Sequence, residues 1–365
     1  MTDNIKQTFL SLVRLGIGHS VTVLPEEIDW ETVHDLASRQ GLSALVLDGA
    51  QALVDCGHQA DAYPMEKALK KQWIAQVIQN FEWAYDDYRK QIAELARFYH
   101  EHGFKMMVLK GYGLSLNYPI PNHRPCGDID IWLFGKYKEA DAVLSQELGI
   151  SIDASHPHHT VFHWNGHLVE NHYDWISVYS HWTAPKIESI FKDLAMDDSW
   201  TVDIDGQKVY LPSPNLHALF LLRHASLHFN TSGVSIRQIL DYGFFVEKHT
   251  KEIDWEWLVD ALKRFKMSNF FACLNEICIE DLGFSAEVFP VEFRKSDIKN
   301  QVLEDSLLKN TEESIPMPNG LFPRVVYKYR HWKKSAWKRR ISYDEGWLPS
   351  FWSTVRAHVL NPKSI

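Results

Sequence analysis

The segment "PCGDIDIW" (125–132) places two aspartates, Asp128 and Asp130, inside a run of residues that favour β-strands. Successive side chains of a strand point to opposite faces, so residues two apart share a face and both carboxylates should point the same way. Two like charges on one face repel each other unless water solvates them or a cation lies between them. This short strand therefore predicts either a solvated sheet edge or a carboxylate pair that binds a cation.

The chain before this strand has a helical period. Asp29 is a candidate N-cap and Gly41 a stop signal for one helix. From Trp73 to Tyr99, apolar residues recur at spacings of three and four, which predicts one long amphipathic helix that ends near Gly103.

Short strands and turns follow, and the helical period then returns. Asparagine-glycine and aspartate-glycine pairs between alternating apolar residues are strong signals of type I′ hairpins. The predicted elements are strands at 104–109 and 128–134, a helix at 136–149, hairpins turning at Asn165-Gly166 and Asp205-Gly206, and helices at 215–229, 235–249 and 253–265.

This order of elements predicts an α+β fold, with a small mixed β-sheet between two helical segments. A length of 365 residues suggests two or three structural units, and a hydrophobic content of 45% supplies ample core. We expect an N-terminal helical segment at 1–103, a central unit at 104–211, and a C-terminal helical domain at 212–365.

The formal net charge of -9 argues against a coat of nucleic acid, but leaves room for a local basic patch. The segment 324–340 is such a patch, with Lys and Arg interleaved with Tyr and Trp and no acidic residue. It is typical of an amphipathic helix with a solvated basic face. The alternative interpretation is a nucleic-acid-binding segment, whose basic residues attract phosphate and whose aromatic rings stack on bases.

The chain is expected to be soluble and cytoplasmic, without a membrane partner. Charged residues interrupt the N-terminal segment, so it does not resemble a signal peptide, and no apolar run is long enough to span a membrane. The cysteines lack metal-ligand spacing and are too few for a disulfide framework, which predicts reduced thiols. They are Cys56, Cys126, Cys273 and Cys278.

The residues around the aspartate pair suggest a function for a bound cation. Upstream, Lys110 lies in a turn with Gly111 and Gly113, and such a strand-to-helix junction offers backbone N–H groups to an anion. Downstream, pairing across the Asn165-Gly166 turn puts Val161 opposite Glu170 and His159 opposite His172. Glu170 and His172 therefore share a face of the hairpin, with His159 alongside.

Gly111, the Asp128-x-Asp130 pair and the later Glu170 resemble the nucleotidyltransferase superfamily that includes DNA polymerase β. Within it, several segments look like the uncharacterised bacterial nucleotidyltransferase family, and the likeness covers most of residues 25–260. These segments are "VLKG" (108–111), an arginine shortly before "GDIDIW", "VENH" (169–172), and "LLRHASLH" (221–228) followed by "ILDYG".

The resemblance implies a nucleotidyltransferase that uses two Mg²⁺ ions and a nucleoside triphosphate, and that transfers a nucleoside monophosphate to a hydroxyl acceptor with release of pyrophosphate. Hard cations need oxygen ligands, and a pair of ions clamps the attacking and leaving oxygens. By resemblance, Asp128, Asp130 and Glu170 bind the metals and carry the catalysis. The predicted phosphate and nucleotide contacts are Lys110, Gly111, Gly113 and Arg124, with His172 supporting the metal ligands.

One residue departs from the superfamily pattern. Tyr112 stands directly after the first glycine, where glycine or serine is usual. This residue supports an alternative in which a degenerate nucleotidyltransferase fold binds a nucleotide or a partner without transfer. The acceptor, whether a small molecule, protein or RNA, and the choice of nucleotide stay open.

The histidines offer a further alternative, a zinc-dependent hydrolase. His224 and His228 have the spacing of four residues that zinc sites use, although the glutamate of the zincin signature is replaced by Ala225. The histidines are better interpreted as hydrogen-bonded residues that line a cleft between the core and the C-terminal helices. They are those of segment 156–159, with His163, His167, His172, His217, His224 and His228.

Overall fold

The computed structural model describes residues 2–21, 27–55, 63–289, 298–309 and 318–360. Within these ranges the chain forms a six-stranded sheet with the order β3-β4-β2-β1-β6-β5. The β2–β4 and β1–β6 pairs are parallel and the other three are antiparallel, so the predicted mixed sheet and the α+β class are confirmed. The strands are β1 (Met107–Val108), β2 (Ile129–Trp132), β3 (His159–Trp164), β4 (His167–His172), β5 (Thr201–Ile204) and β6 (Gln207–Tyr210).

Both predicted hairpins are present. Asn165 and Gly166 have φ of 48° and 90°, and Asp205 and Gly206 have φ of 52° and 79°, as type I′ turns require. The predicted register of the first hairpin is confirmed, with His159 opposite His172.

The strands β1 and β2 are shorter than the sequence predicts. Strand β2 ends at Trp132, because Phe134 and Gly135 both adopt positive φ and turn the chain into α7 (Tyr137–Leu148). At the other end of β2, Asp128 lies just before the first paired residue.

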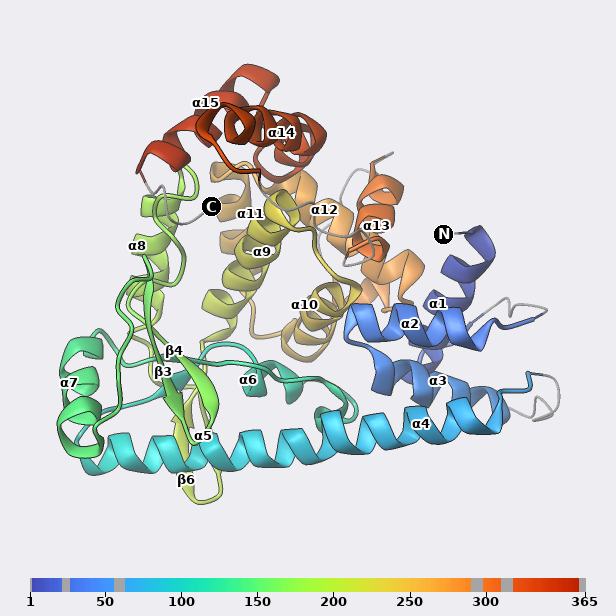
Figure 1. Ribbon diagram of the computed structural model, residues 1–365, viewed down its shortest axis with the longest axis horizontal. Coiled ribbons are helices and arrows are strands. Elements are labelled where there is room, and N and C mark those ends of the chain that lie inside the picture. Colours follow the sequence, from blue (N-terminus) through green and yellow to red (C-terminus); the bar gives the residue numbers. More distant parts are fainter. Residues whose placement is uncertain (1, 22–26, 56–62, 290–297, 310–317, 361–365) are drawn as a thin grey trace.

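The N-terminal helices are α1 (Asp3–Gly16), α2 (Trp30–Gln40), α3 (Ser43–Asp55), α4 (Lys67–Val77) and α5 (Ala84–Glu101). The predicted cap of α2 is confirmed, since the Asp29 side chain accepts a hydrogen bond from the Thr32 N–H and Gly41 is left-handed. The predicted long helix runs from α4 through the π-helical segment η1 (Ile78–Trp83) into α5, and it forms the lower edge of the molecule in Figure 1.

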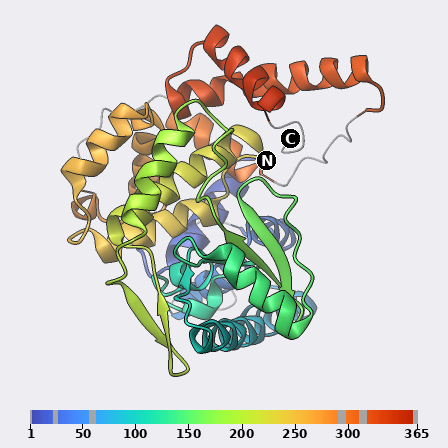
Figure 2. The ribbon, with the colours of Figure 1, turned by 90° about the vertical axis from the view of Figure 1, so that its left-hand side faces the viewer.

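Most of the remaining helices lie on the opposite side of the sheet from α5, and α14 and α15 lie beyond them at the top of Figure 1. Figure 2 shows the long helix end-on below the sheet, with the yellow and orange helices above it. Their bounds are α6 (Tyr112–Ser115), η2 (Pro121–His123), α8 (Ala184–Leu194), α9 (Pro214–Thr231), α10 (Ile236–His249), α11 (Trp255–Arg264), α12 (Ser268–Glu276), η3 (Ile277–Asp281), η4 (Ala286–Val288), α13 (Lys299–Leu307), α14 (Leu321–Tyr343) and α15 (Trp347–Leu360).

Alternation along β2 divides its side chains between two apolar cores. Ile129 and Ile131 belong to the core that contains Tyr88 and Ile92 of α5. Trp132 belongs to a larger core, which α1–α3 share with α9–α13. Because Asp130 alternates with the isoleucines, it points away from α5 and toward the side of the C-terminal helices.

Two further expectations concern the whole chain. No helix in the described ranges is long and apolar enough to cross a membrane. Cys126 and Cys278 are free thiols, as predicted, whereas Cys56 lies outside the described residues. The unit boundaries after residues 103 and 211 stay predictions.

Candidate functional site

The parallel pairing of β2 with β4 places Asp130 directly beside Glu170, and Trp132 beside His172. Residues two apart on a strand share a face, so Glu170 and His172 point to the same side of the sheet as Asp130. One ligand atom from each of Asp130, Glu170 and His172 lies within 4.8 Å of the others. Adjacent strands thus bring together two acidic residues that are 40 positions apart in the sequence.

Two basic side chains contact this pair of carboxylates. The Nζ atom of Lys110 lies 2.7 Å from Oδ1 of Asp130. The Nε2 atom of His172 lies 3.1 Å from the same oxygen and 3.4 Å from Oε2 of Glu170. The other ring nitrogen of His172 contacts the carbonyl oxygen of Asp174 at 3.2 Å, which fixes Nε2 toward the carboxylates.

The charges of these groups stabilise one another. Burial opposes the charged form of Asp130, but the Lys110 ammonium and the His172 hydrogen bond hold its pKa well below the usual range. Burial likewise opposes ionisation of Glu170, and its hydrogen bond with His172 lowers its pKa. The pKa of His172 is raised, since contacts with both carboxylates outweigh its burial. Asp130 and Glu170 are therefore both ionised at neutral pH.

Asp128 lies beside this group but outside it. It is exposed, and among the described residues it does not join Asp130, Glu170 and His172 as a ligand within 4.8 Å. Although the residue is exposed as a whole, the protein around its carboxyl group partly desolvates it, and this effect and the neighbouring charge of Asp130 raise its pKa. The structure thus brings Asp130 and Glu170 together and leaves Asp128 outside the pair.

The glycine turn has a strained backbone that a buried tyrosine contacts. Gly111 has φ of 49° and ψ of -108°. A Cβ atom at this position would lie 2.2 Å from the hydroxyl of Tyr88, so only glycine fits. The N–H of Gly113 donates to the Lys110 carbonyl at 3.0 Å, and Tyr112 is buried against Tyr85. The predicted roles of both glycines as phosphate contacts stay predictions.

Arg124 has a structural partner that the sequence did not reveal. Its guanidinium donates to both carboxylate oxygens of Asp241, at 2.7 and 3.0 Å, and to the carbonyl of Gly111 at 3.2 Å. The side chain is buried in this ion pair. Arg124 thereby ties the glycine turn to α10, and its predicted contact with phosphate stays a prediction.

The histidines of the β3–β4 hairpin form a second group beside the first. Ligand atoms of His158, His159 and His172 lie within 4.8 Å of one another. Burial lowers the pKa of His158 to about 3 and that of His159 to about 4, so both rings are neutral. The hairpin register predicted His159 beside His172, but no sequence pattern placed the loop residue His158 there.

Helix α9 carries the other pair of histidines. The Nε2 atoms of His224 and His228 lie 3.0 Å apart. Burial, followed by the nearby charge of Lys110, lowers the pKa of His224 well below its usual value. Among the described residues, no third ligand joins these two histidines in a possible metal site.

A buried network explains a polar residue in the middle of β4. Asn171 is fully buried, and its amide donates to Oδ1 of Asp141 on α7 at 2.8 Å. The hydroxyl of Thr160 on β3 donates to the other carboxylate oxygen of Asp141, also at 2.8 Å. This network fixes the hairpin on which Glu170 and His172 stand.

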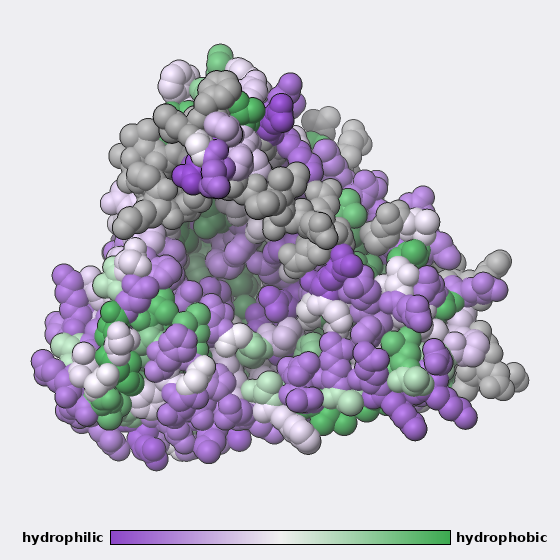
Figure 3. Space-filling view, viewed as in Figure 1, coloured by the Kyte–Doolittle hydropathy of each residue, from purple (hydrophilic) through white to green (hydrophobic). Residues whose placement is uncertain are grey.

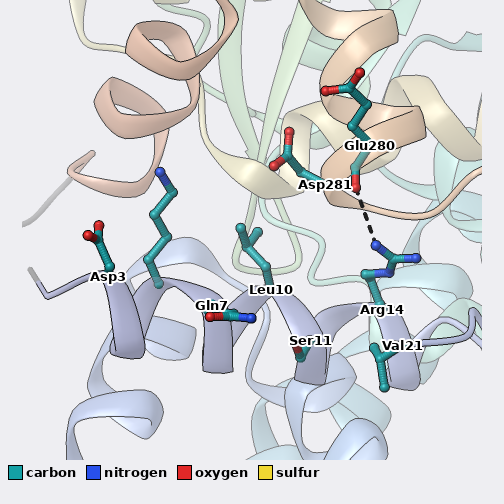
Figure 4. A pocket seen from close by; sticks show the side chains of 9 residues that line it. Asp3, Gln7, Leu10, Ser11, Arg14, Val21, Glu280 and Asp281 are labelled. Carbon is teal, nitrogen blue, oxygen red and sulfur yellow. Dashed lines mark hydrogen bonds between the residues drawn. The ribbon is translucent and has the colours of Figure 1, made fainter. Parts of the chain in front are cut away.

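The surface is hollowed below α14 and α15, over the region where α9 lies, with polar and apolar side chains around the hollow (Figure 3). A separate pocket of about 330 Å³ lies between α1 and η3 (Figure 4). There, Arg14 donates to the Glu280 carbonyl at 3.3 Å. No residue of the carboxylate or histidine groups lines this pocket, which separates it from the candidate site.

Comparisons with known proteins identify a solved structure and a family to which the chain is similar. The chain is similar to a nucleotidyltransferase-like antigenic protein from Paracoccidioides brasiliensis of known crystal structure, with 16% identity, a TM-score of 0.36, and coverage of 56% of this chain and 98% of that one. None of the curated proteins matches the chain. The profile of a family described as uncharacterised nucleotidyltransferase matches residues 26–280, and the chain belongs to this family.

Proposed function

We propose that the chain is a Mg²⁺-dependent nucleotidyltransferase of the DNA polymerase β-like superfamily, which moves a nucleoside monophosphate from a nucleoside triphosphate to a hydroxyl acceptor. The observation that carries the proposal is the pairing of two ionised carboxylates, Asp130 and Glu170, on one face of a mixed sheet. Membership of the family supports the reaction class.

The donor atoms at this site fit divalent cations. Asp130 and Glu170 offer carboxylate oxygens, the ligands that Mg²⁺ prefers, and the Lys110 ammonium beside Asp130 shows that the pair attracts positive charge. Asp128, two residues before Asp130, would add a third carboxylate, so that these three residues would hold two ions. Bound Mg²⁺ would neutralise the triphosphate and lower the pKa of the acceptor hydroxyl.

The proposed transfer is an in-line displacement, in which one bond forms as another breaks. The acceptor oxygen forms a bond to the α-phosphorus while the bond from that phosphorus to the β-phosphate oxygen breaks, and pyrophosphate leaves. Glu170 is the candidate for accepting the acceptor's proton, because its carboxylate is ionised and lies on the same face as Asp130.

The other residues near the site bind phosphate or position the ligands. Lys110 would donate to the phosphate oxygens, with the turn of Gly111 and Gly113 beside it. His172, fixed by the Asp174 carbonyl, holds the two carboxylates at their spacing. Arg124 positions the turn through its bond to Gly111.

Calorimetric titration with Mg-ATP and with the other three Mg-NTPs tests the proposal. We expect metal-dependent binding by the wild type and none by the Asp128→Ala/Asp130→Ala variant. The control is Glu139→Gln, which removes an exposed carboxylate on α7 and should bind like the wild type. Equal binding by the double variant and the wild type would refute the assignment of the site.

A binding module without transfer is the second candidate function. It is favoured by the buried ion pair that Asp130 makes with Lys110 and by the buried Tyr112 in the turn. A screen with radiolabelled NTPs against protein, RNA and small-molecule acceptors separates the two candidates. Incorporated label excludes the binding module, whereas nucleotide binding without incorporation into any of these acceptors favours the binding module.

A further inference from the structure

A second group of potential ligands adjoins the carboxylate pair, and the proposed transfer uses only one of its members, His172, as a positioning residue. His158 lies just before β3, His159 begins that strand, and His172 ends β4. The ring centroids of His158 and His159 are 4.3 Å apart, and those of His159 and His172 are 5.1 Å apart. Three imidazoles from two adjacent strands thus converge on one point of the sheet face.

Two of these rings have ring nitrogens without a hydrogen-bond partner. His159 is 5% exposed, and both its Nδ1 and its Nε2 are buried without one. Nδ1 of His158 is also buried without a hydrogen-bond partner. Buried polar atoms in folded proteins are almost always hydrogen-bonded, and each one left without a partner destabilises the fold. An ion bound by the lone pairs of these rings would remove that destabilisation.

A carboxylate lies next to the three histidines. Oε2 of Glu170 lies 3.7 Å from Nδ1 of His159 and 3.4 Å from Nε2 of His172. This negative charge disfavours a phosphate or another anion among the rings and favours a cation. The contact between Nδ1 of His172 and the Asp174 carbonyl is the outer hydrogen bond that metal-binding histidines usually make.

We propose that His158, His159 and His172, with Glu170 as the adjacent carboxylate, bind one transition-metal ion, and that Zn²⁺ suits this donor set best. Three imidazoles and a carboxylate match the nitrogen and oxygen ligands of four-coordinate zinc, whereas Mg²⁺ prefers oxygen ligands throughout. The zinc site is therefore distinct in its chemistry from the proposed magnesium site, although both use Glu170.

The test uses the full-length chain without an affinity tag, stripped of metal with a chelator. Zn²⁺ is titrated calorimetrically, and Co²⁺ is titrated in parallel because its visible absorption reports four-coordination. We expect one equivalent to bind to the wild type. His158→Gln and His159→Gln should each weaken the binding at least tenfold.

Two controls make the result specific. His163→Gln changes an exposed histidine on the same strand and should bind zinc like the wild type. Asp128→Ala should keep zinc binding while losing the Mg-nucleotide, so that failure of one site is distinguished from failure of the other. Circular dichroism establishes that each variant folds, and His158→Gln, which alters a half-buried ring, carries the test if His159→Gln unfolds.

The proposal is overturned if the wild type binds no zinc at one equivalent. It is also overturned if folded His158→Gln and His159→Gln bind zinc as tightly as the wild type, because the ion would then lie on other residues.

Discussion

The hydroxyl of Tyr88 lies against Gly111 and donates a hydrogen bond to the carbonyl oxygen of Asp128 at 2.9 Å. Tyr88 belongs to α5 and is 2% exposed. One buried side chain therefore contacts both the glycine turn and the residue just before β2. The long helix is thus part of the machinery that positions the candidate site, in addition to covering the sheet.

Gly111→Ala should destabilise the fold by about 2–4 kcal/mol, because the new Cβ adds an overlap with Tyr88 to a backbone conformation that costs about 1–3 kcal/mol for other residues. Urea unfolding measures the change. Gly149→Ala is the matched control, since Gly149 also has positive φ but nothing lies within 4 Å of its Cβ position. The two variants should differ, and Tyr88→Phe should relieve part of the extra cost; equal costs would contradict the overlap.

Lys110→Met should weaken the binding of Mg-ATP by about tenfold to a hundredfold, because the charge-assisted hydrogen bonds of one ammonium contribute about 1.5–3 kcal/mol. Calorimetry measures the affinity. Lys136→Met removes an exposed lysine near the end of β2 and serves as the control. Unchanged affinity in Lys110→Met would show that Lys110 serves only to neutralise Asp130.

Asp241→Ala should cost about 3–5 kcal/mol of stability, because it leaves the buried guanidinium of Arg124 without its partner. The double variant Arg124→Met/Asp241→Ala should cost clearly less than the sum of the two single changes. Urea unfolding of the four proteins gives the coupling energy directly. Additive costs would mean that the two residues do not stabilise each other.

His217→Gln should make the fold less sensitive to acid. Burial, followed by the charge of His249, lowers the pKa of His217 to about 3 from 6.5, so the unfolded chain binds the proton first. The stability that depends on a neutral His217 is fully present above pH 6.5 and is lost as the pH falls toward 3. Below pH 6.5, the wild type should lose up to about 1.4 kcal/mol per pH unit more than the variant. Parallel curves of unfolding free energy against pH would contradict this assignment.

Much of the sheet and of the candidate site could be predicted from short-range patterns. The pair Asn165-Gly166 sets the hairpin register, and that register alone placed Glu170 and His172 on one face beside His159. The alternation of Asp130 with isoleucines likewise predicted a strand with one polar side. Such features depend on neighbouring residues and on the period of two, which a sequence displays directly.

The rest depends on contacts between distant segments. Nothing near Arg124 in the sequence indicates that Asp241, 117 positions later, pairs with it. His158 enters the histidine group through the path of a loop, and Asn171 is explained only by Asp141 on another element. The end of β2 was predicted at residue 134, two residues beyond its actual end at Trp132. The positive φ at Phe134 ends the strand, and local strand propensity does not encode it.

The core that α1–α3 share with α9–α13 has a consequence for synthesis on the ribosome. The buried side-chain amide of Gln40 accepts from the N–H of Ile236 and donates to the carbonyl of Ser306. The hydrogen bonds at the end of α2 therefore need residues that the ribosome synthesises much later. The early helices must therefore keep their apolar faces exposed, or shielded by a chaperone, until translation has passed α13. Protease digestion of stalled nascent chains would show α2 protected only after that point.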